Sequence, residues 1–281
     1  MVLPSPLVNV AQGGDAATMM TTDEQLNFYR FRFGRTMTAT DLAAFSRDLE
    51  TCNLDVMSGA LKQAEAAALA AKKPTRDARG AVMAQYERGV AQLAQLFPVF
   101  FVFESAWRTF AAATLRGIYQ GDNWWHGVRD AVAQGAEVTG ISHLGGRPAA
   151  GEMVRTIGHA LKNVSSCSDL STTYELVEIC SLYHLSKLLE YHWAEFIQRL
   201  NAETALGAPT WGAFEGLFRR VRHARNNAYH HRVVSGRAEV VAAAEQLLDL
   251  LDVHLGGRQA RITGQVLAPL QFTLPELVRH C

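Results

Sequence analysis

The chain has 281 residues, and its 27 basic and 27 acidic side chains give a formal net charge of zero. Hydrophobic residues make up 48% and charged residues 19%, a balance typical of globular proteins with a sizeable core, built as one large domain or two. Nucleic-acid-binding proteins usually carry a basic excess, so any affinity for nucleic acid must come from a local patch.

The same sequence argues against several classes of protein. Its four cysteines are scattered and form no CxxC pair, so we expect neither a disulfide framework nor a zinc site; they are Cys52, Cys167, Cys180 and Cys281. No run reaches the ~18 consecutive apolar residues of a membrane span, and the run at 96–103 is typical of a buried core. The N-terminus lacks a basic region followed by a clear apolar one. We therefore predict a cytoplasmic protein that does not contact a membrane.

The first third of the chain predicts helices after a loose leader at residues 1 to about 20. A capping-box pattern at 22–25 starts an aromatic-rich segment. Apolar residues at intervals of three and four then predict one long helix from Thr40 to Ala71, which Lys72-Lys73-Pro74 would end. Asp77 begins a further helix.

The middle of the chain predicts a helix from Val99 to Ile118, after a break or kink at Pro98. Within it Glu104 precedes Arg108 by four residues, the favourable order for a helical ion pair. We consider either a purely structural pair, or a glutamate that orients a site residue beside an arginine that contacts RNA.

A turn at 121–126 follows, and its two tryptophans, Trp124-Trp125, either anchor the loop to the core or stack on bases. The glycine-rich stretch at 145–151 is interpreted as a flexible connection, with phosphate binding at the next helix start as the alternative.

The last third predicts a long, strongly apolar helix over 172–200, in which His184 and His192 are interpreted as structural histidines. A closing helix is expected over 240–255, capped by Gly256-Gly257, before a tail that could form a strand or an extended arm. Strand signals are sparse, so the fold class is all-α, a multi-helix bundle of about six to nine helices.

The most unusual stretch is residues 222–232, which holds three arginines, three histidines and two asparagines in eleven positions. Four arginines also fall in the seven residues from 219 to 225, which makes this the local basic patch. Buried polar groups cost free energy unless they have partners. The stretch is therefore either a solvated surface or a site.

The spacing in this stretch indicates which side chains could act together. Asn226 and His230 are four residues apart and share a helix face with Arg222, one turn earlier. Arg225 and His230 lie about 140° apart around an ideal helix, so they converge only through arginine's reach, a distortion or a helix end. Arginine offers a rigid fork of donors for phosphate oxygens, and histidine can exchange a proton near neutral pH. With no carboxylate or thiol cluster beside them, they suit metal-free work on a phosphodiester.

The segment Arg225-Asn-Asn-Ala-Tyr-His230 resembles the signature of the HEPN superfamily, and the chain is most similar to its Abi-like branch, associated with phage abortive infection. The counterparts of other branch features are Glu104, Arg108, Gly121 and Trp124-Trp125, and the resemblance spans roughly residues 95 to 255. It implies a HEPN-like domain at 95–281, with residues 1–94 as an N-terminal helical extension that matches no pattern and could be continuous with it.

The resemblance implies a metal-independent endoribonuclease that needs no cofactor and acts in phage defence or a toxin–antitoxin system. His230 would move protons, and Arg225 would hold the phosphate. The supporting residues would be Asn226, Tyr229, His231 and Glu104, and those binding RNA would be Arg219, Arg220, Arg222 and Arg108. A homodimer through the motif face would supply two Arg/His pairs, and an antitoxin protein or RNA could silence the enzyme.

Two other functions remain open. The domain could be a non-catalytic module that binds RNA, a nucleotide or an antitoxin, or the cluster could be a solvated face of a helical protein. Serine or cysteine hydrolase chemistry is not indicated, because GxSxG and a suitable Cys/His pair are missing. A metal site is not expected either, because Tyr229-His230-His231 lacks a second ligand set four residues away.

Overall fold

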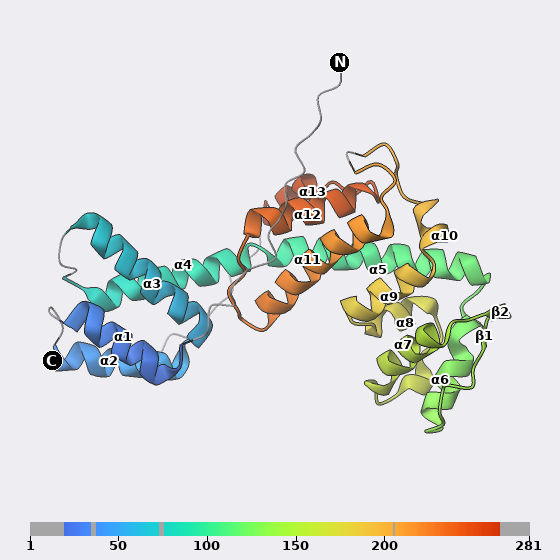
Figure 1. Ribbon diagram of the computed structural model, residues 1–281, viewed down its shortest axis with the longest axis horizontal. Coiled ribbons are helices and arrows are strands. Elements are labelled where there is room, and N and C mark those ends of the chain that lie inside the picture. Colours follow the sequence, from blue (N-terminus) through green and yellow to red (C-terminus); the bar gives the residue numbers. More distant parts are fainter. Residues whose placement is uncertain (1–19, 35–37, 73–75, 205, 265–281) are drawn as a thin grey trace, which may run out of the picture. The chain divides into compact units, whose positions relative to one another are not determined.

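The computed structural model describes residues 20–34, 38–72, 76–204 and 206–264. Within these ranges the regular structure is almost entirely helical, with one small two-stranded sheet, which confirms the all-α class (Figure 1). The chain forms two compact units. One comprises residues up to Leu93 together with His231–Val233, and the other comprises Ala94–His230 with the residues from Val234 onward. The sequence placed its domain boundary between residues 94 and 95.

The described residues of the first unit form four helices: α1 (Thr22–Phe33), α2 (Ala39–Thr51), α3 (Leu54–Ala71) and α4 (Ala78–Ala94). Capping boxes at Thr21 and Thr38 start the first two. In the core, Tyr29 stacks on Phe45 with ring centroids 3.9 Å apart, and Leu61 and Val82 are fully buried beside them. This unit is thus held by its own apolar core.

The long helix expected from Thr40 to Ala71 is wrong, because the chain breaks between α2 and α3. Cys52 is extended, and the Oδ1 atom of Asn53 accepts hydrogen bonds from the backbone N–H groups of Asp55 and Val56. An asparagine that caps new N–H groups competes with helix continuation. The three- and four-residue spacing of apolar residues continues across this break because α2 and α3 each bury an apolar face in the same core.

The second unit is built on α5 (Phe97–Tyr119), which starts with Pro98 in its first turn. Its fully buried Phe103 and Trp107 contact Phe218 of α11 (Trp211–Tyr229), with ring centroids 5.2 and 6.2 Å away. In Figure 1, α11 runs obliquely across α5, and α12 (Arg237–Asp249) lies next to α11 and also contacts α5. This packing fixes which side chains of α11 face α5 and which face away.

The helical stretch 78–119 is the one part of the described chain that is long and apolar enough to be a candidate membrane span. Only 28% of its most apolar window is buried, and Phe101 in that stretch is 65% exposed. The expected burial of the run at 96–103 therefore holds for one face of α5 only. Core helices of soluble proteins also meet these criteria of length and composition, so the stretch does not assign the protein to a membrane.

The chain between α5 and α11 consists of short elements: η2 (Asn123–Trp125), α6 (His126–Ala133), β1 (His143–Leu144), β2 (Arg147–Pro148), α7 (Gly151–Lys162), η3 (Cys167–Asp169), α8 (Thr173–Ile179), α9 (Leu182–Tyr191) and α10 (Trp193–Ile197). The glycine-rich stretch expected to be a flexible connection forms a tight hairpin instead. Gly145 and Gly146 have φ of +52° and +78° between the two antiparallel strands. Glycine adopts such left-handed angles without steric cost, which explains the pair.

The single long helix expected over 172–200 is also wrong. Ser181 accepts a hydrogen bond from the N–H of His184 and starts α9, while Cys180 and His192 interrupt the helical path. The residues nonetheless remain strongly apolar, and Leu185, Leu188 and Leu189 are fully buried. Burial and helix continuity are separate properties, and the apolar pattern predicted only the first.

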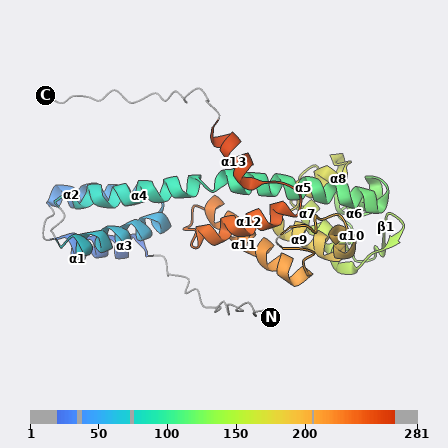
Figure 2. The same cartoon turned by 90° about the horizontal axis from the view of Figure 1, so that it is seen from above.

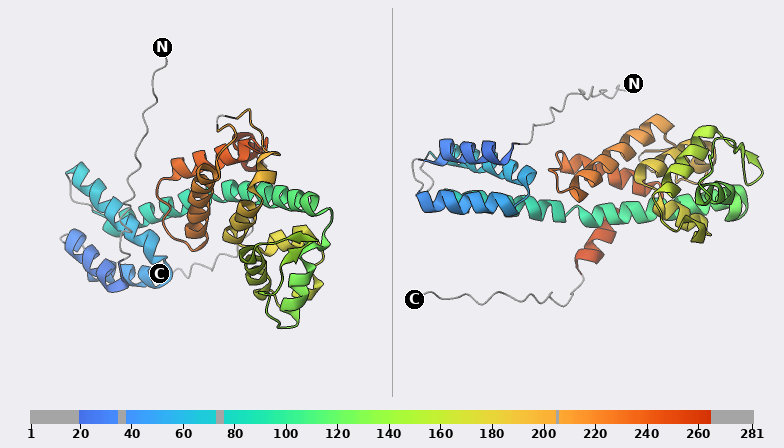
Figure 3. Two further views of the ribbon diagram at one scale, coloured as in Figure 1. Left: turned by 45° about the vertical axis from the view of Figure 1, so that its right-hand side comes forward. Right: turned by 90° about the horizontal axis from the view of Figure 1, so that it is seen from below.

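The closing helix is shorter than expected, because α12 ends at Asp249 and α13 (Leu255–Thr263) begins where a glycine cap was predicted. Gly256 and Gly257 lie inside α13. Figures 2 and 3 show α13 against α5 on the side away from α11. The predicted leader at residues 1–19, and the strand or arm after residue 264, lie outside the described residues, as does Cys281.

Candidate phosphate-binding site on helix 11

Helix α11 positions the residues of the Arg/His motif. The hydroxyl of Thr210 caps its start, and its apolar stripe faces the core: Phe214, Phe218, Val221, Ala224 and Ala228. The stripe fixes the rotation of the helix, so the polar residues between its members project along its edges or away from the core.

Arg225 lies at one edge of this stripe and is held on several sides. Its Nε donates to Oε1 of Glu104 at 2.6 Å, and its Nη2 lies 3.5 Å from Oε2. The guanidinium carbon lies 4.0 Å from the ring centre of Tyr229, and Nη1 donates weakly to Asn226 at 3.4 Å. The two carboxylate oxygens of Glu104 and the ring face of Tyr229 together fix the orientation of the guanidinium.

Glu104 also contacts a second arginine. Its Oε2 lies 3.4 Å from Nη2 of Arg108, the helical ion pair expected from the sequence. The Nη1 of Arg108 donates to three backbone carbonyls at the end of α8, those of Val177, Glu178 and Cys180, at 2.5, 3.2 and 2.7 Å. Arg108 is 9% exposed, so its role is to close the end of α8. The RNA contact expected of Arg108 stays a prediction, and its burial argues against it.

His230 lies where α11 ends, as one of the sequence alternatives anticipated. Tyr229 is the last helical residue, and the backbone N–H of His230 donates to the carbonyl of Asn226 at 3.0 Å. The ring is exposed and makes no hydrogen bond to any residue in the described ranges, Arg225 included. An exposed imidazole beyond a helix end is accessible to an incoming ligand.

The residue after it changes the path of the chain. His231 has a φ of +55°, a backbone angle that residues other than glycine rarely adopt. It is the first of the three residues, His231–Val233, that belong to the first unit. In that unit the backbone N–H of Val233 donates to Asp55 at 2.6 Å. Of the supporting residues expected at the motif, Glu104, Asn226 and Tyr229 contact Arg225 in the second unit.

The other arginines of the basic patch are in different states. Arg222 donates to the hydroxyl of Ser186 and lies over the ring of Tyr183, and burial lowers the pKa of its guanidinium. Arg219 lies 3.7 Å from Glu215 in an exposed pair. Arg220 is exposed, and its guanidinium makes no ion pair or hydrogen bond with the described part of the chain.

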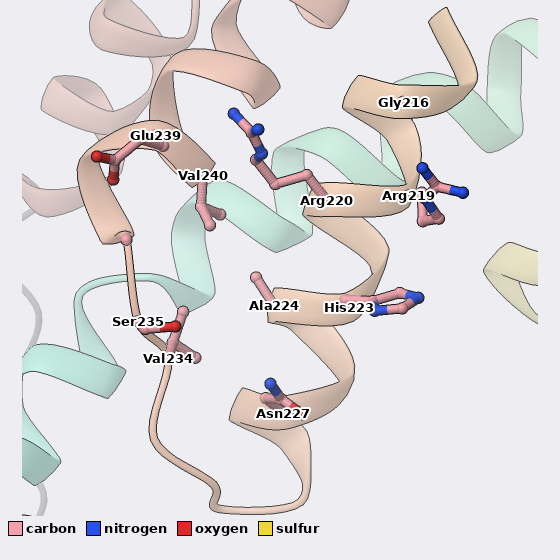
Figure 4. A pocket seen from close by; sticks show the side chains of 11 residues that line it. Gly216, Arg219, Arg220, His223, Ala224, Asn227, Val234, Ser235, Glu239 and Val240 are labelled. Carbon is pink, nitrogen blue, oxygen red and sulfur yellow. The ribbon is translucent and has the colours of Figure 1, made fainter. Parts of the chain in front are cut away.

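A groove of about 480 Å³ lies on another side of α11, against the start of α12 (Figure 4). Its polar lining includes Arg219, Arg220, His223, Asn227 and Ser235. His223, Asn227 and Ser235 were not predicted as site residues from the sequence. A signal was present for His223 and Asn227, because residues 220, 223 and 227 follow the three- and four-residue spacing of one helix face, whereas Ser235 lies in the loop after α11 and had none.

The two tryptophans of the turn at 121–126 and the two histidines of the segment 172–200 lie away from the motif on α11. Trp124 and Trp125 are 2% and 0% exposed, and the indole N–H of Trp124 donates to Thr173, so they anchor the loop instead of stacking on bases. His192 is buried and shares a 3.1 Å hydrogen bond with the hydroxyl of Tyr119, and burial lowers its pKa. His184, the other proposed structural histidine, is half-buried, and burial lowers its pKa as well.

No family model, no curated protein and no solved structure matches the chain.

Proposed function

We propose that the protein is a metal-independent endoribonuclease of HEPN type, with Arg225 and His230 as its catalytic residues. The observation that carries the proposal is the 2.6 Å ion pair between Arg225 and Glu104. These residues lie 121 positions apart, and the same two were singled out by the resemblance for the motif and for its upstream helix. A guanidinium held in a fixed orientation is a preorganised donor for a developing phosphate charge.

Arg225 keeps part of its donor capacity in this arrangement. A guanidinium has five N–H groups, and the contacts to Glu104 and Asn226 use three of them. The remaining N–H groups are on the two terminal nitrogens, the edge that binds two phosphate oxygens at once. Glu104 therefore orients Arg225 without exhausting it.

The proposed reaction is transesterification within the RNA strand. The ribose 2′-oxygen attacks the adjacent phosphorus while its proton passes to a base, and the bond from phosphorus to the 5′-oxygen breaks. The leaving oxygen takes a proton, which gives a 2′,3′-cyclic phosphate and a 5′-hydroxyl. His230 would move these protons, since imidazole can both accept and donate near neutral pH. Arg225 would stabilise the added negative charge at phosphorus.

One chain supplies one Arg/His pair, whereas in-line displacement is best served by a base and an acid on opposite sides of the phosphorus. A homodimer through the motif face would place two such pairs opposite each other across a two-fold axis. Two partly exposed aromatic rings at the motif, one of them against Arg225, support this proposal. Tyr229 is 43% and Phe97 38% exposed, and their rings meet edge to face with centroids 5.3 Å apart.

The direct test is cleavage of end-labelled cellular RNA by the purified protein in EDTA, with mass spectrometry of the product ends. We expect cyclic phosphate ends from the wild type, and a loss of at least about 100-fold in rate for Arg225→Ala and His230→Ala. His254→Ala is the matched control, because His254 is an exposed histidine at a helix start in the same unit. Wild-type cleavage by both motif variants would falsify the assignment.

A non-catalytic RNA- or nucleotide-binding module, or a partner for an antitoxin, is the second candidate. The observation that favours it is that the guanidinium of Arg225 already has a carboxylate partner, which leaves it fewer N–H groups for a transition state. Such a module should retard RNA in a gel without shortening it. Its affinity should fall with salt according to the number of phosphates contacted.

A further inference from the structure

The groove between α11 and α12 has walls of different composition. One wall is α11, with Arg220, His223 and Asn227 projecting from it, and the other is the loop and first turn of α12 from Val234 to Val240. Figure 4 shows the guanidinium of Arg220 extending from α11 toward the space between the two helices. Val234 and Val240 are 7% and 3% exposed and provide an apolar floor. The groove therefore combines a polar wall that carries Arg220 with a buried apolar floor.

The side-chain N–H donors that line this groove make no hydrogen bond within the described part of the chain. No hydrogen bond or ion pair links the side chains of Arg220, His223 or Asn227 to any residue in the described ranges. By contrast, Arg108, Arg222 and Arg225 all donate to atoms of the protein. Unused donors that share one cavity are available to a ligand without the loss of an existing contact.

The charge of the lining favours an anion. Arg219 and Arg220 contribute two positive charges and Glu239 one negative charge, while the ring of His223 points away from α12 in Figure 4. Arg219 is partly neutralised by Glu215 at 3.7 Å, which leaves Arg220 as the main cation. In Figure 4 the carboxylate of Glu239 points away from Arg220, so it does not cover the guanidinium.

We infer that this groove binds a phosphoryl group, through the guanidinium of Arg220 with the side-chain amide of Asn227 as a further donor. Arginine's planar fork matches phosphate oxygens, and an amide N–H adds a neutral donor to such an anion. A volume of about 480 Å³ lies within the range of sites that hold small ligands. The phosphoryl group could belong to a free nucleotide or to the end or backbone of an RNA strand.

The groove is separate from the motif on the same helix. Arg220 precedes Arg225 by five residues, which corresponds to about 140° of rotation and ~7.5 Å of rise on an ideal helix. One phosphate therefore does not contact both guanidinium groups in the orientation that Glu104 imposes on Arg225. The inference does not depend on RNA cleavage, and the groove binds its ligand whether or not the motif is catalytic.

The test measures binding to the full chain by titration calorimetry at low salt, with three probes. Pyrophosphate reports the shared chemistry, a nucleoside 5′-triphosphate represents the free nucleotide, and a 5′-phosphorylated ten-residue RNA represents the strand. We expect Arg220→Ala and Asn227→Asp to weaken pyrophosphate binding at least tenfold, because the first removes the main cation and the second adds a negative charge. Thermal melting shows whether each variant is folded.

Arg116→Ala is the matched control, since Arg116 is an exposed arginine of the same unit that lies outside the groove and pairs with Asp122. The inference is supported if the control binds pyrophosphate like the wild type while the groove variants do not. A preference for the triphosphate or for RNA then identifies the source of the phosphoryl group. Equal weakening in the control, or no binding of any probe at millimolar concentration, would overturn it. RNA cleavage assayed in parallel on Arg220→Ala and His230→Ala separates failure of the groove from failure of the nuclease.

Discussion

The two sides of α11 use the same side-chain type in opposite ways. On one side Arg225 is bound to Glu104 and covered by Tyr229, so most of its guanidinium is committed within the protein. On the other side Arg220 faces a groove and has no partner among the described residues. Arg225 is therefore held in one orientation and partly neutralised, whereas Arg220 is exposed and has no carboxylate partner among the described residues.

The difference shows that a basic patch counted in a sequence is not one functional surface. The four arginines between residues 219 and 225 divide into one exposed ion pair, one unpaired side chain and two partly buried side chains with partners. Preorganised donors suit a transition state, where charge develops at a fixed point. Unpaired donors suit capture of a ligand that already carries its charge.

Glu104→Ala should destabilise the protein more than any other single change at the motif. This change leaves Arg108 and Arg225, whose side chains are only 11% and 28% exposed, without their shared carboxylate. Removing one partner of a buried ion pair costs about 3–5 kcal/mol, and the partial exposure of Arg225 lowers the expectation to about 2–4 kcal/mol. Urea denaturation measured by circular dichroism checks the value.

Glu215→Ala is the control for that experiment, because it removes the partner of Arg219 on the exposed part of the same helix. Surface pairs of this kind contribute about 0–1 kcal/mol, so we expect a loss of no more than about 0.5 kcal/mol. If the two glutamate variants are equally stable, Glu104 does not hold the cluster together.

Replacing each of the two arginines by alanine should destabilise the protein to different extents. Arg225→Ala removes the ion pair and the contact with Tyr229, and we expect a loss of about 1–2 kcal/mol because Glu104 keeps Arg108 as a partner. Arg220→Ala removes no contact within the described chain, so its effect should stay within about 0.5 kcal/mol. Thermal melting of both variants tests the difference, and a larger loss for Arg220→Ala would contradict the assignment of the two sides.

Sequence reasoning predicted the helical class and the existence of most helices, because apolar spacing reports directly which face is buried. It did not predict where helices break. Asn53 and Ser181 each cap a new helix within a stretch of continuous apolar rhythm. Competition between a side-chain oxygen and the helical carbonyls decides such breaks, and it depends on local geometry that periodicity does not contain.

For the candidate site, too, the sequence predicted local features but not contacts between distant helices. The helix end at His230 was foreseeable from weak helix formers, and the i,i+4 spacing gave the pair of Glu104 with Arg108. The approach of Glu104 to Arg225 depends on how α5 and α11 pack, a tertiary contact over 121 residues. Burial of Arg108 at the end of α8 could not be foreseen either, since it required the break at Cys180.

The smallest expected effect concerns Tyr229, which tests whether the aromatic face helps to hold Arg225. Its ring lies under the guanidinium and meets Phe97 edge to face. An exposed cation–π contact and an aromatic pair each contribute about 0.5–1 kcal/mol, and the 43% exposure of Tyr229 places Tyr229→Ala near 1 kcal/mol in total. Tyr229→Phe keeps both ring contacts, so it should melt like the wild type. A double-mutant cycle with Arg225→Ala isolates the contact, because the tyrosine change should cost about half as much once the guanidinium is gone. A cost unchanged by the loss of Arg225 would show that the ring packs only on Phe97 and leaves the orientation of Arg225 to Glu104 alone.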